Sequence, residues 1–507
     1  MKNKNILVKS VKYLVFLVFL TITAKVEAQQ ARYMMTTDIP SSITTPSEVK
    51  TSLGTLKFFD GFPDAATTQK VYDNLDFQRG VQAYLASLPV ASLYAMHQSF
   101  LTFGPDNKTV LMAESFMDSH SLVLTANSET VYSTVWLNTK DGPVVIEVPP
   151  NVLGVIDDDW ERFVTDVGKP GPDHGMGGRY LLLPPGYEGN VPGGYFVSHS
   201  RTFGNHMFFR GFLINGDRRP AIENAKKNFR IYPLSDSANL PVMNFVNISG
   251  KVFNMVFASD RSFYHQVASV IGEEPLEATD PETRGLLAAI GIQKGKPFFP
   301  DERMKSILSD AAAVGNATAR TIAFSTRDPE AYLYKNCAWK VLLIGNNPEF
   351  SPGGVLNLDA RTHFFYNIFG TSPAITWKMV GIGSQYATAE RDAGGNYLDG
   401  SKNYRLRLPP NIPMKDFWSL IVYDPQTRSM LQTDQQYPSV SSQKEGLVVN
   451  PDTSVDIYFG PKLPSGKGKN WIQTIPGKGW FVALRLYGPL ESWFDKTWRP
   501  GEIELTE

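Results

Sequence analysis

The chain has 507 residues, with 49 basic and 50 acidic side chains and a formal net charge of −1. This length predicts two or three domains, each large enough to bury a hydrophobic core of its own. Because Lys and Arg form no large cluster, the charge argues against a nucleic acid or an anionic membrane surface as a partner.

The first residues predict a secretory signal peptide. Four lysines within the first twelve residues precede an apolar run over residues 13–24, and Val26-Glu27-Ala28 supplies a small-residue cleavage site. The apolar run is too short to span a membrane. We therefore expect cleavage after Ala28 and export to the periplasm or to the outside, with a retained N-terminal anchor as the alternative.

Residues 29–70 are rich in Thr, Ser and Pro and show little hydrophobic periodicity, which predicts an extended N-terminal arm. From residue 71 to about residue 100, apolar residues recur at spacings near three and four. Pro89 interrupts this pattern, so two consecutive helices are expected there.

Strand patterns follow between residues 100 and 214, separated by turn sequences such as Asp141-Gly142-Pro143. The predicted strands cover residues 122–124, 131–137, 144–148, 180–183, 194–197 and 207–214. Strands with no helices between them indicate an antiparallel sandwich and not a parallel sheet with crossover helices.

The hydrophobic period becomes helical again between residues 252 and 327. Asp280 followed by Pro281 predicts a helix start, because the Asp side chain can cap free N–H groups and Pro lacks only a donor that would be unused. An apolar stripe from Met304 to Ile322 extends this part into a small helical bundle or lid.

The last third of the chain returns to strand patterns. A strand is predicted at Arg361–Phe369, and others follow at residues 417–423, 455–459 and 480–486, where apolar residues alternate or run without a break. The final third is therefore expected to form a second all-β domain.

Several motifs in these strands resemble a known family. The C-terminal motifs are Asp416-Phe417-Trp418-Ser419, residues 423–430 (YDPQTRSM), residues 455–461 (VDIYFGP) and Gly479-Trp480-Phe481. They are similar to the domain of unknown function numbered 1214. The earlier motifs, residues 127–133 (NSETVYS), 142–145 (GPVV) and 178–181 (GRYL), resemble its usual partner, the domain of unknown function numbered 1254.

The resemblance implies an immunoglobulin-like β-sandwich, a small helical module and a C-terminal jelly-roll β-sandwich, which agrees with the periodicity. We therefore expect a mainly β, multidomain chain. Its expected parts are a signal peptide (1–28), the arm (29–70), a helical lead-in and sandwich (71–245), the helical module (246–345) and the jelly-roll (346–507). Family members commonly have an Asp where this chain has Glu129, so a role that needs a short carboxylate does not carry over.

The sequence has no Gly-x-Ser-x-Gly elbow, phosphate-binding loop or His-Glu-x-x-His helix. Polar residues concentrate instead in the first sandwich, where carboxylates, an imidazole and guanidinium groups could meet at one end of the sheet. Such groups can hold an anion and move protons near neutral pH. The residues predicted to line this site are Asn127, Glu129, Tyr132, Arg162, Asp166, His174 and Arg179.

In this hypothesis Glu129 or Asp166 is the general acid or base. His174 is the proton shuttle and Arg179 is the clamp for an anion, while Asn127, Tyr132 and Arg162 contact the ligand. The acidic run at residues 157–159 has a simpler interpretation as an ordinary solvated loop.

The remaining histidines and the cysteine predict no further chemistry. His199 and His206 lie near Arg201 and Arg210 in the sequence, yet a zinc site needs three or four ligands aimed at one point, which their spacing does not indicate. No residue is assigned as a metal ligand, and the sequence leaves open whether a metal or a cofactor is bound. Cys337, the single cysteine, cannot form an internal disulfide and is expected to be a buried small hydrophobic group.

Three functions stay open at this point. The protein is an exported enzyme acting on a small organic or sugar-like substrate, a ligand-binding protein without catalysis, or a structural or interaction protein of the cell envelope. The partners consistent with the sequence are a small-molecule ligand and a second copy of the chain.

Overall fold

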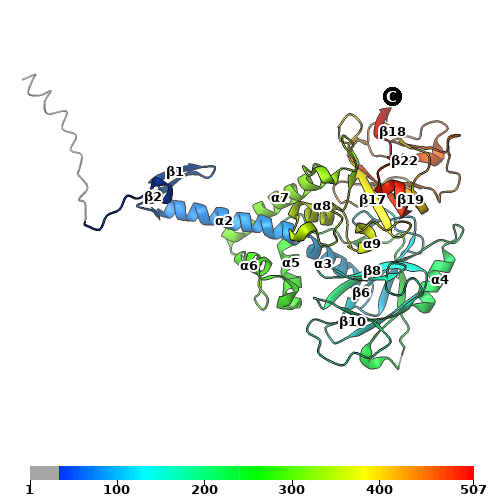
Figure 1. Cartoon of the computed structure of the whole chain (residues 1–507), viewed down its shortest axis with the longest axis horizontal. Helices are drawn as coiled ribbons and strands as arrows, with labels where there is room; N and C mark the ends of the chain where they lie inside the picture. The colour runs from blue at the N-terminus through cyan, green and yellow to red at the C-terminus, as the bar shows by residue number, and fades with distance from the viewer. Residues whose placement is uncertain (1–33, 239, 507) are drawn as a thin grey trace, which may run out of the picture. The chain divides into compact units, whose positions relative to one another are not determined.

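The computed structural model describes residues 34–238 and 240–506, and Figure 1 shows the chain with its helices and strands labelled. It divides into two compact units, with the boundary after Tyr72. The signal peptide predicted over residues 1–28 lies outside the described residues.

The first unit contains a three-stranded antiparallel sheet made of β1 (Glu48–Thr51), β2 (Gly54–Phe59) and β3 (Phe62–Pro63). The short helix η1 (Ser41–Ile43) precedes it and α2 (Ala65–Ala86) follows. Gly54 has a φ of +90° at the turn between β1 and β2, a conformation that favours glycine. Residues 48–70 therefore differ from the extended arm that we expected, because tight turns fold the segment back on itself.

In the second unit, helices from separate parts of the sequence share one hydrophobic core. They are the end of α2, α3 (Leu88–Leu101), α5 (Ser262–Glu273), α6 (Pro281–Ala289), α7 (Glu302–Phe324) and α8 (Leu358–Asn367). The predicted start of α6 is confirmed, since the Asp280 carboxylate accepts a hydrogen bond of 2.9 Å from the Thr283 N–H. The packing is close: a Cβ added to Gly315 of α7 would lie 2.7 Å from Cγ of Tyr84 in α2.

The strand predicted at Arg361–Phe369 is wrong, because most of this segment forms α8. The Asn357 side chain accepts a hydrogen bond from the Ala360 N–H at 2.9 Å and so caps the start of the helix. Phe364, Phe365 and Tyr366 are all buried. A short apolar run that is buried on every side has no period that separates helix from strand.

Two sheets make up the part between residues 109 and 247. The six-stranded sheet has the order β14-β4-β6-β12-β8-β9 and the four-stranded sheet has the order β11-β10-β7-β13. Their strands are β4 (Thr109–Met112), β6 (Val131–Asn138), β7 (Val144–Val148), β8 (Val152–Asp158), β9 (Phe163–Gly168), β10 (Gly178–Leu183), β11 (Phe196–His199), β12 (Gly204–Gly211), β13 (Arg230–Pro233) and β14 (Asn244–Asn247). Side chains of both sheets belong to one hydrophobic core, and most neighbouring strands run antiparallel, with β14–β4 and β10–β11 as parallel pairs.

The interpretation of residues 157–159 as a solvated loop is wrong. Asp157 and Asp158 end strand β8, each with 1% exposure, and Asp159 follows with 5% exposure. Neither β8 nor β9 was predicted, because acidic side chains interrupt the apolar pattern that marks a strand. These acids are buried because segments distant in the sequence cover them, and the local sequence does not show this.

The C-terminal part also contains two sheets with a shared core. The five-stranded sheet has the order β16-β17-β23-β19-β20 and the four-stranded sheet has the order β22-β21-β18-β24. The strands are β16 (Lys340–Val341), β17 (Ser384–Ala389), β18 (Asn403–Leu408), β19 (Met414–Tyr423), β20 (Ser439–Ser441), β21 (Val455–Gly460), β22 (Trp471–Gln473), β23 (Phe481–Pro489) and β24 (Ile503–Thr506). The strands predicted at residues 417–423, 455–459 and 480–486 are confirmed as β19, β21 and β23.

The smaller elements connect these layers. They are the paired strands β5 (Ser121–Leu122) and β15 (Phe253–Asn254), the helices α4 (Arg219–Asn228), α9 (Pro373–Thr376) and α10 (Glu491–Phe494), and the short helices η2 (Leu234–Asp236), η3 (Leu276–Ala278), η4 (Pro329–Ala331), η5 (Pro352–Gly354) and η6 (Gly468–Asn470). Each strand predicted between residues 122 and 214 overlaps an observed one. The chain is thus sheet-rich and built from several sheets, with a helical core alongside them.

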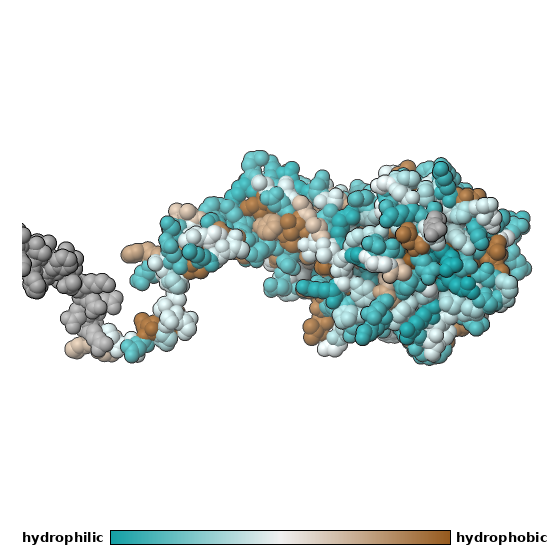
Figure 2. Space-filling model, turned by 90° about the horizontal axis from the view of Figure 1, so that it is seen from above, coloured by the Kyte–Doolittle hydropathy of each residue, from teal (hydrophilic) through white to brown (hydrophobic). Residues whose placement is uncertain are grey.

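A further hydrophobic core joins the two sheet pairs, and it contains Tyr132 and Trp136 of β6 together with Tyr423 and Phe481 of the C-terminal strands. The face in Figure 2 is mostly hydrophilic, and hydrophobic residues form small separate groups on it. Within the described ranges, no helix has the length and apolar character needed to cross a membrane.

Candidate anion-binding site

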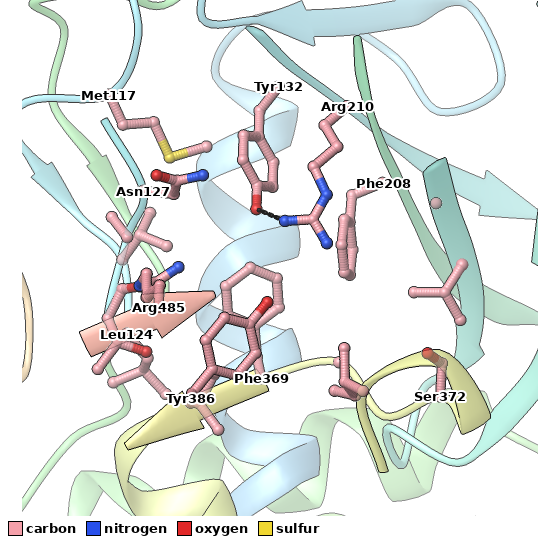
Figure 3. Close-up of a pocket in the computed structure, with 18 of the residues that line it drawn as sticks. Met117, Leu124, Asn127, Tyr132, Phe208, Arg210, Phe369, Ser372, Tyr386 and Arg485 are labelled. Atoms are coloured by element: carbon pink, nitrogen blue, oxygen red, sulfur yellow. Dashed lines mark hydrogen bonds between the residues drawn. The ribbon is translucent and has the colours of Figure 1, made fainter. Parts of the chain in front are cut away.

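A cavity of about 50 Å³ lies where the two sheet pairs meet. Strands β6 and β12 supply one wall and strands β17 and β23 supply another, while the segments 123–127 and 368–372 close the ends. Figure 3 shows Tyr132 and Arg210 entering this space from one side and Tyr386 from the opposite side. A water molecule needs about 10–15 Å³ by this measure, so the cavity has room for only a few atoms.

Two Tyr–Arg pairs face one another across the cavity. Tyr132 and Arg210 lie directly opposite each other on β6 and β12, and Tyr386 and Arg485 do so on β17 and β23. The Arg210 guanidinium donates hydrogen bonds to the Tyr132 hydroxyl at 3.1 Å and to the Ser384 hydroxyl at 2.9 Å. Because Ser384 belongs to the second sheet pair, the Arg210 side chain bridges the two parts of the chain.

Both arginines are buried without an acidic partner. Arg210 is 2% exposed and Arg485 is 3% exposed. Arg485 donates to the Thr125 carbonyl, and its guanidinium carbon lies 5.1 Å from the centre of the Tyr386 ring. Among residues 34–238 and 240–506, no carboxylate lies within ion-pair distance of either guanidinium. A buried charge without a counter-charge costs several kcal/mol, so the pocket is strongly suited to an anion.

The charges of the two arginines change the pKa of Tyr386. Burial by itself would raise the pKa of its phenol, but the charges of Arg210 and Arg485 outweigh burial, and the pKa of Tyr386 is lowered. Tyr386 therefore releases its proton more readily than an ordinary tyrosine. It can donate a hydrogen bond to a bound anion or act as an acid in the pocket.

The other walls are largely apolar and come from residues such as Leu124, Phe208 and Phe369. The Asn127 amide also lines the cavity, and it donates a hydrogen bond of 2.9 Å to the Tyr487 hydroxyl. The pocket thus combines a cationic, hydroxyl-lined part with a hydrocarbon lining. This composition suits a small organic molecule with one anionic group.

Buried carboxyl groups hold one wall of the pocket in place. The Gly370 N–H donates to Glu161 at 2.8 Å, and the Thr371 N–H donates to Asp157 at 3.0 Å. Burial raises the pKa of both carboxyl groups well above the ordinary values, and in Asp157 the nearby Glu161 adds to the shift. These acids contact the backbone of the 368–372 segment, so their role is to position that segment.

Asp166 lies behind the same wall, on β9. It is 7% exposed, and burial raises its pKa to about 7, while a hydrogen bond with the Ser372 hydroxyl opposes the shift. Ser372 itself lines the cavity. Asp166 can therefore exchange a proton near neutral pH. It contacts the pocket through one residue, Ser372.

The structure does not bring the sequence-predicted set together in one cleft. Asn127 and Tyr132 line the cavity and Asp166 adjoins it, whereas Glu129 lies in a separate cleft. Arg162 forms an ion pair of 2.7 Å with Asp158 beside a third pocket. His174 precedes β10 and Arg179 lies near the start of β10, and both side chains are exposed. The prediction of this set failed because it assumed that polar residues close in the sequence have side chains that meet at one end of the sheet.

Three central residues were missed as members of this site: Arg210, Tyr386 and Arg485. One signal was present, since Arg485 is the only charged residue in the otherwise apolar run Phe481–Leu486. Alternation places it opposite Leu484 and Leu486, on the face of β23 that meets the other sheet pair. No local pattern indicated Tyr386, because its importance depends on its distance from two arginines.

Of the two histidines considered for metal binding, His199 is exposed and His206 has a structural partner, as does His97 of α3. His206 lies within 2.7 Å of the Thr134 hydroxyl, and burial lowers its pKa to about 3. His97 contacts Asp106 at 2.9 Å and stacks on Trp136. In the portion of the chain that the structure describes, no three His, Cys, Asp or Glu side chains are placed to hold a metal ion. Cys337 is buried, as predicted.

Comparison with known proteins locates these residues in two families. The family described as a protein of unknown function (DUF1254) matches residues 107–233, and the family described as a protein of unknown function (DUF1214) matches residues 383–491. Tyr132 and Arg210 come from the first match and Tyr386 and Arg485 from the second. The pocket is therefore built by both domains.

Among solved structures, the VPA0106 protein from Vibrio parahaemolyticus is similar over 85% of this chain and 100% of that chain, with 18% identity and a TM-score of 0.52. An uncharacterised protein from Burkholderia cenocepacia is matched over 87% of this chain and 96% of that chain, with 11% identity and a TM-score of 0.39. No curated protein matches the chain. The chain thus contains a match to DUF1254 followed by a match to DUF1214, the arrangement of a two-domain family of unknown function.

Proposed function

We propose that this protein binds a small organic anion, of the kind of a short monocarboxylate, in the pocket between its two domains. The observation that carries the proposal is the buried pair Arg210 and Arg485, which lacks an acidic partner within the described part of the chain. A carboxylate between them would supply the missing negative charge and accept charge-assisted hydrogen bonds.

The rest of the pocket limits the ligand. Phe208, Phe369 and Leu124 favour a short hydrocarbon body, and a cavity of about 50 Å³ excludes a large one. The hydroxyls of Tyr132 and Tyr386 supply further donors to the anionic end. Acetate, propionate and butyrate are therefore the first probes.

The test measures the melting temperature and the binding heat of the full chain with each carboxylate, against sodium chloride at equal ionic strength. A ligand that binds only the folded state raises stability by RT ln(1 + [L]/Kd), about 2.7 kcal/mol at a hundredfold excess over Kd. Arg485→Lys should weaken binding about tenfold or more, because Lys cannot reproduce the fork of N–H donors. Arg327→Lys is the matched control, since Arg327 is 91% exposed.

Tyr386→Phe gives a second variant that removes one hydroxyl without removing a buried charge. It should weaken carboxylate binding while leaving the fold intact. If the carboxylates act no differently from chloride, or if both pocket variants bind them as the wild type does, the proposed function is wrong.

An enzyme that acts on the bound anion is the second candidate, and Asp166 favours it. Its pKa of about 7 and its contact with Ser372 let it take up or release a proton beside the pocket at neutral pH. Pyruvate in deuterated water is a suitable probe, because acid–base catalysis of its enolisation exchanges the methyl protons with solvent. Faster loss of the methyl signal with the wild type than with Asp166→Asn would support catalysis. A rate equal to that in buffer would support binding without catalysis.

We also propose export and a finer fold class. The signal-peptide pattern of residues 1–28 supports export, and N-terminal sequencing of the protein from a secreting host should find Gln29 first. The shared core of the six- and four-stranded sheets supports an immunoglobulin-like sandwich. The core of the five- and four-stranded sheets supports a jelly-roll.

A further inference from the structure

A second and larger cleft lies at the boundary of the two domains, with a volume of about 400 Å³. Small-molecule sites commonly measure about 300–1,000 Å³, so this cleft is large enough for a ligand that contains one six-membered ring. Its lining comes from the segments 128–129 and 213–218 of the DUF1254 part and from residues 435–444 of the DUF1214 part. It is distinct from the anion pocket: Asn127 lines that pocket, whereas the next two residues, Ser128 and Glu129, line this cleft.

Glu129 is the central acid of the cleft. Its carboxylate oxygen accepts hydrogen bonds from the Ser128 hydroxyl at 3.1 Å and from the Ser439 hydroxyl at 2.9 Å. Burial raises the pKa of Glu129, although the hydroxyls of Ser441, Ser439 and Ser128 oppose the shift. A raised pKa means that Glu129 keeps its proton to a higher pH than an ordinary glutamate, and in the protonated form the carboxyl group can donate a hydrogen bond to a ligand.

Two cations face the same space. Lys444 donates to the Ser439 carbonyl at 3.2 Å, and the Arg218 guanidinium lies 5.9 Å from the centre of the Phe116 ring. Both side chains line the cleft. In residues 34–238 and 240–506, neither has a carboxylate within ion-pair distance. Their charges are therefore available to an anionic group of a ligand.

The remaining lining supplies hydrogen-bonding groups and an aromatic surface. Tyr437 and Phe116 contact each other edge to face, with ring centres 6.0 Å apart. The exposed side chains of Gln436 and Gln443 also line the cleft. Amides, hydroxyls and an aromatic wall suit a ligand that carries several hydroxyl groups on a ring with apolar C–H faces.

We propose that this cleft is a second binding site, which takes an acidic sugar of the uronate class. The carboxylate of the sugar pairs with Lys444 and Arg218, and its hydroxyls bond to Glu129 and to the serines and glutamines around it. The two cations select against a neutral sugar, and the polar lining selects against a simple carboxylate.

D-Glucuronate is the probe, measured by isothermal titration calorimetry with the full chain. Lys444→Gln and Arg218→Gln each remove one charge, and each should weaken glucuronate binding about tenfold, the effect of one charge-assisted hydrogen bond. Arg218 is exposed, so its substitution leaves folding unaffected and keeps the test valid if Lys444→Gln is unstable. Lys402→Gln removes an exposed charge elsewhere and should bind glucuronate as the wild type does.

Two comparisons separate this site from the anion pocket. Arg485→Lys should leave glucuronate binding unchanged, and acetate should fail to displace glucuronate. D-Glucose should bind at least about tenfold more weakly, because it lacks the charge. The proposal is overturned if glucuronate gives no binding heat, if glucose or acetate competes equally, or if Arg218→Gln and Arg485→Lys exchange their expected effects.

Discussion

Asp166→Asn should make the protein more stable than the wild type at neutral and alkaline pH. The Asp166 carboxyl is 7% exposed, and burial raises its pKa from 3.8 to about 7 against the opposing hydrogen bond of Ser372. In the unfolded chain the carboxyl returns to its ordinary pKa. The folded state therefore holds this proton more tightly than the unfolded state between about pH 4 and pH 7.

The sign of the effect follows from proton binding. Where the folded state binds more protons, the free energy of unfolding falls as the pH rises. The rise of the Asp166 pKa from 3.8 to about 7 corresponds to about 4 kcal/mol of folding stability. This stability is fully lost above about pH 8. Asn has nearly the same shape and does not ionise, so the variant avoids this loss. Below about pH 4 the carboxyl is protonated in both the folded and the unfolded state, and the two proteins should differ little. At pH 5 the unfolded chain has lost the proton and the folded protein has not, so the difference is already about 1.5 kcal/mol.

Urea unfolding followed by tryptophan fluorescence at pH 5, 6, 7 and 8 measures the difference. The advantage of Asp166→Asn should grow with pH and reach at most about 4 kcal/mol at pH 8. Asp310→Asn, at an exposed position of α7, controls for the loss of a negative charge. A difference that stays constant with pH, or a variant less stable than the wild type at pH 8, would refute the reasoning.

Three further predictions concern packing. Gly315→Ala should lower the free energy of unfolding by about 1–3 kcal/mol, because the new Cβ would lie 2.7 Å from Cγ of Tyr84, whereas Gly285→Ala in α6 has open space and should stabilise by about 0.5–1 kcal/mol in the same urea titration. Leu484→Ala should cost about 2–5 kcal/mol, since this fully buried side chain of β23 leaves a cavity, and a loss below 1 kcal/mol would contradict the burial. Cys337 should react with a thiol reagent only after urea is added, because burial shields it and raises its pKa; rapid labelling of the folded protein would disprove this.

Much of the secondary structure could be predicted where one face of an element is apolar. The strand at β21 has alternating burial, and the helix start at Asp280 follows from capping chemistry that is entirely local. The prediction failed at α8, where all sides are buried and the period disappears. It also failed at β8, where acids replace the apolar residues that normally mark a strand.

The candidate site was predicted only in part. Asn127 and Tyr132 line the anion pocket and Asp166 adjoins it, so these choices lie close to the observed geometry. His174 and Arg179 are exposed, and neither lines the pocket. The cationic centre was missed because its two arginines come from different domains.

The sequence by itself determined most of the secondary structure of this protein, the caps and turns that end its elements, and the two family models that it matches. Those properties depend on residues within a few positions of one another. Only the tertiary structure decided the sites. Arg210 and Ser384 are 174 positions apart and lie within 2.9 Å, so the folding of two sheet pairs against each other creates the charged pocket. No short stretch of sequence shows whether a carboxylate from elsewhere in the chain lies beside a buried arginine.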